Sequence, residues 1–288
     1  MIFEKAHAKI NLSLDITGKR ENGYHDVRMI MQTLDLCDEL SFEKGESGVR
    51  LTTDDEMLNK EQSEGSDNLV IKAANKLSEA VGRTFNVNIS LKKSIPIAAG
   101  MAGGSADAAA ALRGLNRLFD LKLSNDELRE IAVKIGADVP FCVEGGLVLC
   151  EGIGEKLTPL KGPKNLKVLI CKPDIFVSTK DVYIAYDKEP SPYHPDVDEM
   201  AVALKKEDIL KTAKLLGNTL ESVTKKAHPV IGEIEKSMLD AGALNSIMTG
   251  SGPTVFGIFN DEDLLLKGER KLKESYPGFF VGRTYTLA

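Results

Sequence analysis

The sequence lacks several features that would place it in a special class of protein. Its four cysteines, at positions 37, 142, 150 and 171, show neither C-x-x-C nor metal-ligand spacing and stand among apolar neighbours, so we expect buried, reduced thiols and a reducing cytosol. No apolar run is long enough to span a bilayer, and the chain opens directly on strand-like sequence, with no room for a targeting peptide. We therefore expect a cytoplasmic protein that makes no contact with a membrane.

An excess of positive charge is also missing. The chain has 37 Lys and Arg against 43 Asp and Glu, a formal net charge of −6 at pH 7, whereas nucleic-acid binding needs a basic face. No internal repeat or low-complexity tract is visible, and no His, Asp and Glu cluster has metal-ligand spacing, although Mg²⁺ needs only one or two protein oxygens. We expect no nucleic acid as partner.

What is present is an ordinary globular composition with room for two modest domains. Of the 288 residues, 42% are hydrophobic and 28% are charged. We place the domains at 1–157 and 158–288, because Gly152, Gly154 and Pro159 punctuate the chain between them. Strand-like and helical segments mix without strict alternation, which predicts an α+β fold.

The first half contains several segments with clear periodicity. The pattern predicts strands over 3–16 and 29–42 and a helix over 69–81. Ser124 and Glu127 form a capping box that opens a further helix, and Gly136 suits the position that ends it.

The second half begins anew after the punctuated stretch. Residues 168–171 read as a short buried strand, and 187–198 (DKEPSPYHPDVD) read as a proline-rich polar loop. Pro229 opens a helix that ends near Gly242 and leads into a loop and a strand.

A glycine-rich segment, IPIAAGMAGGSADAAAA at 95–111, is the most informative motif. It follows strand-like alternation over 87–92 and runs into an alanine-rich helix, with Ser105 placed to cap that helix and Asp107 in its first turn. Unpaired N–H groups and the positive end of a helix dipole would meet there, which predicts a phosphate cradle. It has neither the lysine of a Walker loop nor the spacing of a dinucleotide fingerprint, and a plain tight turn is the alternative.

Two charged residues stand where they could take part in chemistry. Lys9 shares the polar face of the first strand with His7 and Asn11, and a solvated strand face is the alternative interpretation. Asp138 follows the glycine that ends a helix, so its carboxylate is either a helix cap or a base.

Two loops leave similar alternatives open. Tyr24 and His25 could decorate the surface or could stack on and read a flat base. The segment 249–253 (TGSGP) could be a simple hairpin connection or a second backbone nest beside the glycine-rich segment.

Four segments, taken together and in this order, resemble the GHMP small-molecule kinases: AKINLSLDITGKRENGYHDV, IPIAAGMAGGSADAAAALRGLN, GADVPFC and TGSGPTVFGIF. The resemblance implies an N-terminal domain like ribosomal protein S5 domain 2 and a C-terminal α/β sandwich. It implies ATP- and Mg²⁺-dependent phosphorylation of a hydroxyl on the methylerythritol part of a cytidine diphosphate-linked polyol. We expect a monomer or weak homodimer.

The resemblance also assigns roles to residues of this sequence. It implies that Lys9 and Asp138 are the catalytic pair, that Asn68 lies near the adenine, and that Ser105 contacts Mg²⁺ or phosphate. The ATP phosphates would be wrapped by Pro96, Ile97, Ala98, Ala99, Gly100, Met101, Ala102, Gly103, Gly104, Ser105 and Ala106. The polyol substrate would be bound by Asn11, Tyr24, His25, Thr179 and Tyr183, with His25 reading the cytosine edge.

The glycine-rich segment departs from the family pattern at three positions. Met101 replaces a leucine and conserves apolar volume. Ala102 replaces a glycine and Ala106 a serine, which restricts φ at one position and removes a hydroxyl at the other.

Other functions remain to be weighed. A GHMP kinase for homoserine or mevalonate is disfavoured by Tyr24 and His25, because neither substrate has a base to stack. A nucleotide-binding regulator without turnover should have lost Lys9 or Asp138, and both are present. A purely structural module is the third alternative.

Overall fold

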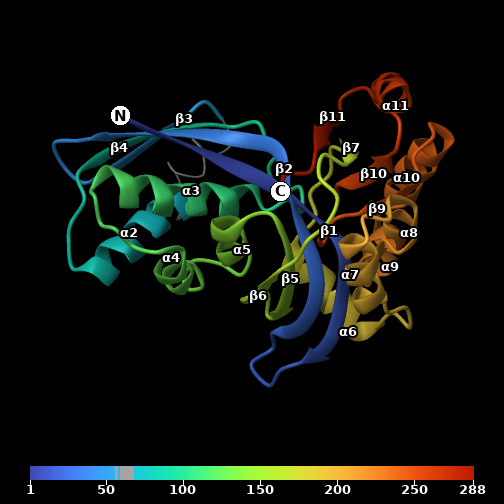
Figure 1. Cartoon of the computed structure of the whole chain (residues 1–288), viewed down its shortest axis with the longest axis horizontal. Coiled ribbons are helices and arrows are strands. Elements are labelled where there is room, and N and C mark those ends of the chain that lie inside the picture. The colour runs from blue at the N-terminus through green and yellow to red at the C-terminus, as the bar shows by residue number, and fades with distance from the viewer. Residues whose placement is uncertain (56–57, 59–67) are drawn as a thin grey trace. The chain divides into compact units, whose positions relative to one another are not determined.

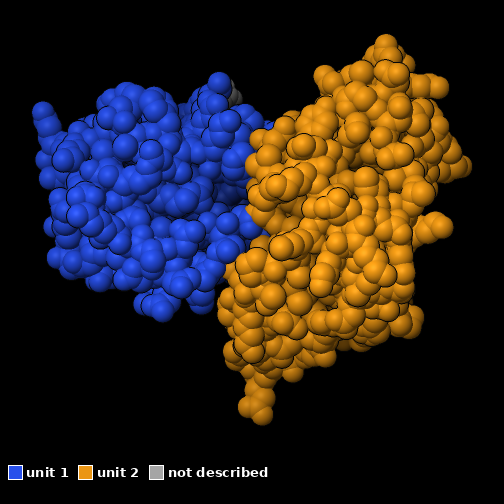
Figure 2. All heavy atoms as spheres, in the orientation of Figure 1, with its two compact units in different colours: residues 1–8, 36–97, 102–145 blue, residues 9–35, 98–101, 146–288 orange. Residues whose placement is uncertain are grey.

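The computed structural model describes residues 1–55, 58 and 68–288, and these form two compact units that Figure 2 colours separately. Two long strands, β1 (Ile2–Lys19) and β2 (His25–Lys44), contribute residues to both units. Unit 1 comprises Met1–Ala8, Leu36–Ile97 and Ala102–Gly145, and unit 2 comprises Lys9–Asp35, Ala98–Met101 and Gly146–Ala288. The domain boundary at 157/158 was placed from the sequence alone, whereas these units are defined by packing, so the boundary stays a prediction.

In unit 1, helices pack on one side of a small sheet (Figure 1). β3 (Val49–Thr53) pairs parallel with β4 (Val87–Lys92), and β4 pairs antiparallel with the Glu39–Lys44 part of β2. The helices are α2 (Leu69–Val81), α3 (Gly103–Leu118), α4 (Asn125–Ala132) and α5 (Val139–Glu144).

Helix α2 has the bounds that its periodicity predicted. The Asn68 side chain accepts a hydrogen bond from the main-chain N of Val70 and so caps the helix, and Gly82 ends it in the left-handed conformation with a φ of 63°. Val70, Leu77 and the alanines between them are buried against the unit 1 core.

Helix α3 begins earlier than its sequence suggested. The prediction that Ser105 caps it is wrong, because the N-cap position is Ala102, with a φ of 57° and no side-chain capping bond. Ser105 is the third helical residue. Asp107 therefore lies beyond the first turn, and its carboxylate pairs with Lys93 instead.

Small residues let α3 approach the sheet closely. A Cβ added at Gly114 would overlap the Phe42 ring, and Ala108 to Ala111 are fully buried. A helix of larger side chains could not lie so near β2.

The capping box that opens α4 is confirmed, but the predicted end is wrong. Ser124 and Glu127 exchange both reciprocal bonds. The helix ends at Ala132, four residues before Gly136, because the next main-chain N–H groups turn to carbonyls three residues back, as Ile135 does to Ala132.

Unit 2 contains a four-stranded antiparallel sheet of order β11-β7-β10-β9, with α10 and α11 packed on it (Figure 1). The rest of its strands join β1 and β2: β8 pairs parallel with β1, and β5 lies between β2 and β6. The bounds are β5 (Leu147–Gly152), β6 (Lys156–Pro159), β7 (Lys167–Lys172), α6 (Thr179–Lys188), α7 (Val197–Lys205), α8 (Ile209–Lys214), β8 (Gly217–Asn218), α9 (Glu221–Ala227), α10 (Val230–Asp240), β9 (Asn245–Met248), β10 (Val255–Phe259), α11 (Glu262–Ser275) and β11 (Phe280–Tyr285).

Most of the elements predicted for this half are confirmed, with one correction. The strand over 168–171 lies within β7, and α10 starts directly after Pro229. The predicted loop over 187–198 is shorter. Asp187 and Lys188 belong to α6, because the buried side chains of Val182 and Tyr186 extend the helical spacing to its last turn, and Val197 and Asp198 begin α7.

The structure also tests two of the absences seen in the sequence. None of the four cysteines forms a disulfide; Cys150 and Cys171 are buried, and Cys37 and Cys142 are only half-buried. Burial raises the pKa of the Cys171 thiol to about 12, which makes it chemically inert. Among the described residues, no helix is both long and apolar enough to cross a membrane.

Candidate active site

Lys9, a residue of unit 2, is buried, with 4% of its surface exposed. Its Nζ atom donates hydrogen bonds of 2.7 Å to Oδ1 of Asn11 and 3.1 Å to the main-chain O of Gly100. Its main-chain N donates to the O of Met101 over 3.1 Å. A solvated strand face is therefore excluded, since a buried ammonium is retained only where such partners hold it.

Asn11 connects this lysine to the loop after β9. Its main-chain N donates to Oγ1 of Thr249 over 3.0 Å, and the same hydroxyl donates to its Oδ1 over 3.3 Å. Asn11 and Thr249 are both buried. The Asn11 amide oxygen thus receives hydrogen bonds from both Lys9 and Thr249, which fixes the direction of its side chain.

The two glycine-bearing loops of the sequence lie against each other inside unit 2. A Cβ added at Gly100 would lie 2.6 Å from the O of Thr249, and one added at Gly250 would lie 2.9 Å from the O of Gly100. Both glycines have positive φ, +70° and +59°. Only glycine fits at either position, because the backbones approach within the space a side chain would take.

Two alanines of the same segment adopt the conformation that glycine favours. Ala98 and Ala102 have φ values of 51° and 57°. Left-handed alanine is strained by about 1–2 kcal/mol. The restriction of φ expected at Ala102 is therefore confirmed, and the backbone adopts the left-handed conformation there despite the strain.

In unit 1, the segment continues into the N-terminus of α3, where the first N–H groups lack helical partners. Gly104 is exposed, and a Cβ there would meet only Cδ1 of Leu69, at 3.4 Å. Gly103 is more crowded, since its Cβ would lie 3.1 Å from Cγ2 of Ile95. This helix end has the character of an anion site.

A buried ion triad underlies this helix end, and the sequence reasoning missed it. Nζ of Lys93 lies 2.5 Å from Oδ2 of Asp38 and 2.7 Å from Oδ2 of Asp107. Oδ1 of Asp38 accepts from the main-chain N atoms of Ser94 and Ile95, which anchors the start of the glycine-rich segment. Burial raises the pKa of Asp107 to about 7, against the pull of Lys93. The only sign of this triad in the sequence was Lys93, just before the glycine-rich segment.

The two other polar residues predicted for unit 1 stand at helix starts. The Asn68 side chain caps α2 through a 2.8 Å bond from the N of Val70, so its nearness to adenine stays a prediction. Asp138 occupies the N-cap position of α5 but makes no side-chain capping bond, which excludes the cap interpretation. Since Lys9 belongs to unit 2 and Asp138 to unit 1, their pairing also stays a prediction.

In unit 2, α6 brings two side chains to His25. Its Nε2 lies 2.7 Å from Oδ1 of Asp187, and its ring centroid is 4.9 Å from that of Tyr183, at an interplanar angle of 35°. Hydrogen bonds from Lys19 and then His25 lower the pKa of the Asp187 carboxyl. Sequence reasoning missed Asp187, although it stands four residues after Tyr183, on the same helix face.

The remaining predicted substrate residues lie in the same unit. Tyr24 precedes His25 and is 59% exposed, so its ring is accessible. Oγ1 of Thr179 lies 2.9 Å from Oγ of Ser251, which places the start of α6 against the 249–253 loop. The structure thus joins Thr179 to that loop and Tyr183 to His25, whereas Tyr24 reaches into solvent.

No group of three or more His, Cys, Asp and Glu side chains within the described parts of the chain is arranged to hold a metal ion. A Mg²⁺ held by one protein hydroxyl and nucleotide phosphates would leave no such cluster. The Ser105 hydroxyl at the start of α3 fits that donor set.

Two family models match the chain: the GHMP kinases N terminal domain over residues 68–146 and the GHMP kinases C terminal domain over residues 200–278. A protein of Caldicellulosiruptor saccharolyticus named 4-diphosphocytidyl-2-C-methyl-D-erythritol kinase is 48% identical over 93% of this chain and 92% of its own length. The chain belongs to that family of GHMP kinases.

Further comparisons agree with this assignment. A 4-diphosphocytidyl-2-C-methyl-D-erythritol kinase of Clostridium beijerinckii is 42% identical over 97% of this chain and 99% of its own. A crystal structure of a 4-(cytidine 5'-diphospho)-2C-methyl-D-erythritol kinase has a TM-score of 0.82 at 29% identity, covering 99% of both chains. The predicted α+β fold of the GHMP kinases is confirmed.

Proposed function

We propose that this GHMP kinase transfers the γ-phosphoryl group of ATP to the 2-hydroxyl of 4-(cytidine 5'-diphospho)-2-C-methyl-D-erythritol, a step of the non-mevalonate isoprenoid pathway. The observation that carries the proposal is the 48% identity, over nearly the full length of both chains, to a kinase named for this substrate. The cytoplasmic location and the monomeric or weakly dimeric state stay predictions.

ATP binding is assigned to Pro96–Ala106 and Asn68. The start of α3 offers unpaired N–H groups, and Gly103 and Gly104 keep side chains away from an approaching phosphate. Phosphoryl transfer needs mainly positioning and charge stabilisation, which backbone amides in a fixed loop provide.

Lys9 and Asp138 are assigned the chemistry. Asp138 would accept the proton of the attacking hydroxyl or orient it, and Lys9 would attract the oxygens of the transferred phosphoryl group. The support for Lys9 is its burial and its fixed hydrogen bonds to Asn11 and Gly100. The support for Asp138 is a carboxylate that its own helix does not use as a cap.

The cytidine diphosphate and polyol are assigned to Asn11, Tyr24, His25, Thr179 and Tyr183. The exposed Tyr24 ring offers a stacking face, and the Tyr183 ring already contacts His25. Asp187 holds Nε2 of His25, which leaves Nδ1 of a neutral imidazole as an acceptor for an exocyclic amine such as that of cytosine.

Mg²⁺ would be held by the ATP phosphates and the Ser105 hydroxyl, and it would neutralise charge on the equatorial phosphoryl oxygens. Metal removal by chelation should abolish turnover while leaving the fold intact.

The test is ADP release by the purified chain with ATP and Mg²⁺, against a panel of the cytidine-linked polyol, mevalonate and homoserine. We expect turnover only with the cytidine-linked polyol. Preference for mevalonate or homoserine would assign another GHMP kinase activity. A thermal shift with ATP but no turnover on any of the three would indicate a nucleotide-binding regulator.

A further inference from the structure

Asn218, a buried residue outside the assigned site, forms hydrogen bonds with the loop that contacts Lys9 and Asn11. Nδ2 of Asn218 donates to the main-chain O of Met248 over 2.9 Å and to that of Gly250 over 2.8 Å. Its Oδ1 accepts from the N of Leu220 over 3.0 Å. Asn218 is 3% exposed, so all three bonds are shielded from water. Both donors of the amide are used on carbonyls that flank Thr249.

The backbone of Asn218 is in turn fixed to the strand that contains Lys9. Asn218 pairs with Leu14 in the parallel β8–β1 ladder, and the N of Thr219 donates to the O of Leu14 over 2.9 Å. Asn218 therefore connects β1 to the end of β9 and the 249–253 loop, through contacts separate from those of the Lys9 and Asn11 side chains.

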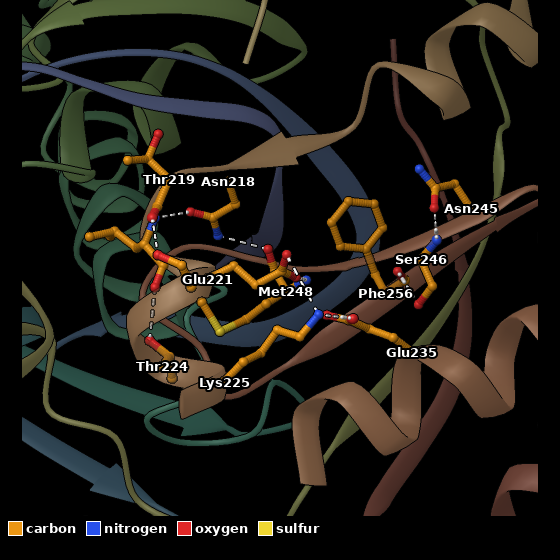
Figure 3. Close-up of polar contacts among 12 residues, drawn as sticks. Asn218, Thr219, Glu221, Thr224, Lys225, Glu235, Asn245, Ser246, Met248 and Phe256 are labelled. Carbon is orange, nitrogen blue, oxygen red and sulfur yellow. Dashed lines mark hydrogen bonds and ion pairs between the residues drawn. The ribbon is translucent and has the colours of Figure 1, made fainter. Parts of the chain in front are cut away.

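Glu221 makes a further hydrogen bond to Met248, the residue just before this loop. Oε1 of Glu221 accepts from the main-chain N of Met248 over 2.9 Å, and Figure 3 shows Asn218 and Glu221 reaching Met248 together. The N and O of Met248 are thus both bound by side chains of one short segment. The loop has little freedom to shift along the β9 direction while these bonds hold.

From the loop, contacts continue to the candidate catalytic lysine. Thr249 binds both the main-chain N and Oδ1 of Asn11, and that oxygen accepts from Nζ of Lys9. The O of Gly100, which also accepts from Nζ, packs against Gly250. These two acceptors of the ammonium group therefore touch the loop that Asn218 holds.

We propose that Asn218 is a positioning residue of the kinase: it sets the place of the 249–253 loop and, through Thr249 and Gly250, the place of the Lys9 ammonium group. The inference rests on the proposed function only for the role of Lys9. Asn218 makes no contact with the reacting atoms in this scheme, and its effect falls on the chemical step rather than on nucleotide affinity.

The test compares Asn218→Asp with Asn245→Asp, a matched control. Asn245 also donates its Nδ2 to a carbonyl, that of Ala213, over 2.7 Å, and its Oδ1 accepts from Ser246, at the far end of β9. Figure 3 shows both asparagines. In Asn218→Asp, a carboxylate oxygen faces the two loop carbonyls, whereas Asn245→Asp makes the same chemical change away from the loop.

Asn218→Asp should lower kcat by about 10–100-fold, the effect expected of misplacing a reacting group by about 1 Å, with KM for ATP within about threefold. The kcat of this variant should recover as the pH is lowered, because protonation restores one donor to the new carboxyl group. Asn218→Ala should show the loss without the recovery, and Asn245→Asp should keep the wild-type kcat. Wild-type kcat in folded Asn218→Asp, or an equal loss in the control, overturns the proposal.

A measurement on the ligand-free chain separates this inference from the function. The Lys9 side chain, labelled with ¹³C at Cε, should shift its NMR resonance in Asn218→Asp and in Asn218→Ala but not in Asn245→Asp. An unmoved resonance overturns the positioning role even if activity falls. A wild-type protein that is inactive on the substrate panel overturns the proposed function, while the resonance still decides the role of Asn218.

Discussion

Asn11 and Thr249 are 238 residues apart in the sequence, yet the main-chain N of Asn11 donates to Oγ1 of Thr249 over 3.0 Å. The contact joins the strand that begins unit 2 to the loop between β9 and β10. Because Lys9 donates to the same asparagine, a loop near the C-terminus helps to set a lysine near the N-terminus.

Asp138→Asn is nearly isosteric and removes no capping bond, so fold and ligand binding should be kept. Turnover should fall by about 10²–10⁴-fold, the usual contribution of a positioned general base. Steady-state kinetics with ATP and the cytidine-linked polyol would measure this. A loss below about tenfold would recast Asp138 as a residue that orients the hydroxyl, since proton transfer can be late in a loose transition state.

Gly104→Val should weaken ATP binding by roughly tenfold or more, because its side chain separates backbone N–H groups from a charged phosphate. The fold should survive, as a Cβ there meets only Leu69 at 3.4 Å. Gly232→Val is a suitable control, since Gly232 also lies in the first turn of a helix and its Cβ would meet only Cε of Lys225, at 3.5 Å. Calorimetric titration with ATP would decide, and equal affinities in the two variants would contradict the phosphate cradle.

Tyr24→Ala should reduce binding of the cytidine-linked polyol by about 1–3 kcal/mol, the value typical of aromatic stacking on a base. ATP affinity should hardly change. Phe3→Ala removes another exposed aromatic ring and should affect neither ligand. If Tyr24→Ala weakened both ligands equally, the assignment of this residue to the pyrimidine would be wrong.

Ala102→Gly should stabilise the protein by about 0.5–1 kcal/mol. Glycine relieves left-handed strain of about 1–2 kcal/mol, and the greater conformational entropy that it gives the unfolded chain offsets part of this gain. Ala106→Gly, inside α3, should instead destabilise by about 1 kcal/mol. Denaturant unfolding of both variants measures the sign. A loss of stability in Ala102→Gly would show that the loop does not hold the strained conformation.

Glu221→Gln should change how stability depends on pH. Burial, and then Glu235, raise the pKa of Glu221 to about 8, above its ordinary value of 4.5. Between these values the folded state keeps a proton that the unfolded state has released, so stability falls as pH rises, by at most about 1.4 kcal/mol per pH unit. Glutamine has no proton to keep, and the variant should lose less stability between pH 5 and pH 8.

Unfolding at pH 5, 6.5 and 8 would test this. The stability difference between variant and wild type should grow in favour of the variant with rising pH. The contribution of Asp107, whose pKa is also raised, is common to both proteins and cancels. A difference that stays constant across the range would contradict the raised pKa of Glu221.

The sequence by itself determined the local elements and the family. Helix α2 has its predicted bounds because Asn68 and Gly82 act on neighbours within a few residues. The Ser124–Glu127 box is equally local. The glycine-rich segment, with the three further motifs in order, was enough to indicate a GHMP kinase. Its two alanines in the left-handed conformation show that the turn is imposed on residues that do not favour it.

Only the tertiary structure decided which polar residues are buried and what they hold. The alternation along β1 could not reveal that Lys9 and Asn11 are covered. Lys9 contacts Gly100, 91 residues away, and Asn11 contacts Thr249, 238 residues away. Asp187, Asn218 and the pair of Asp38 with Lys93 escaped notice for the same reason. Local periodicity reports which face a residue occupies, whereas the partners of a buried polar group are set by long-range packing that no short pattern encodes.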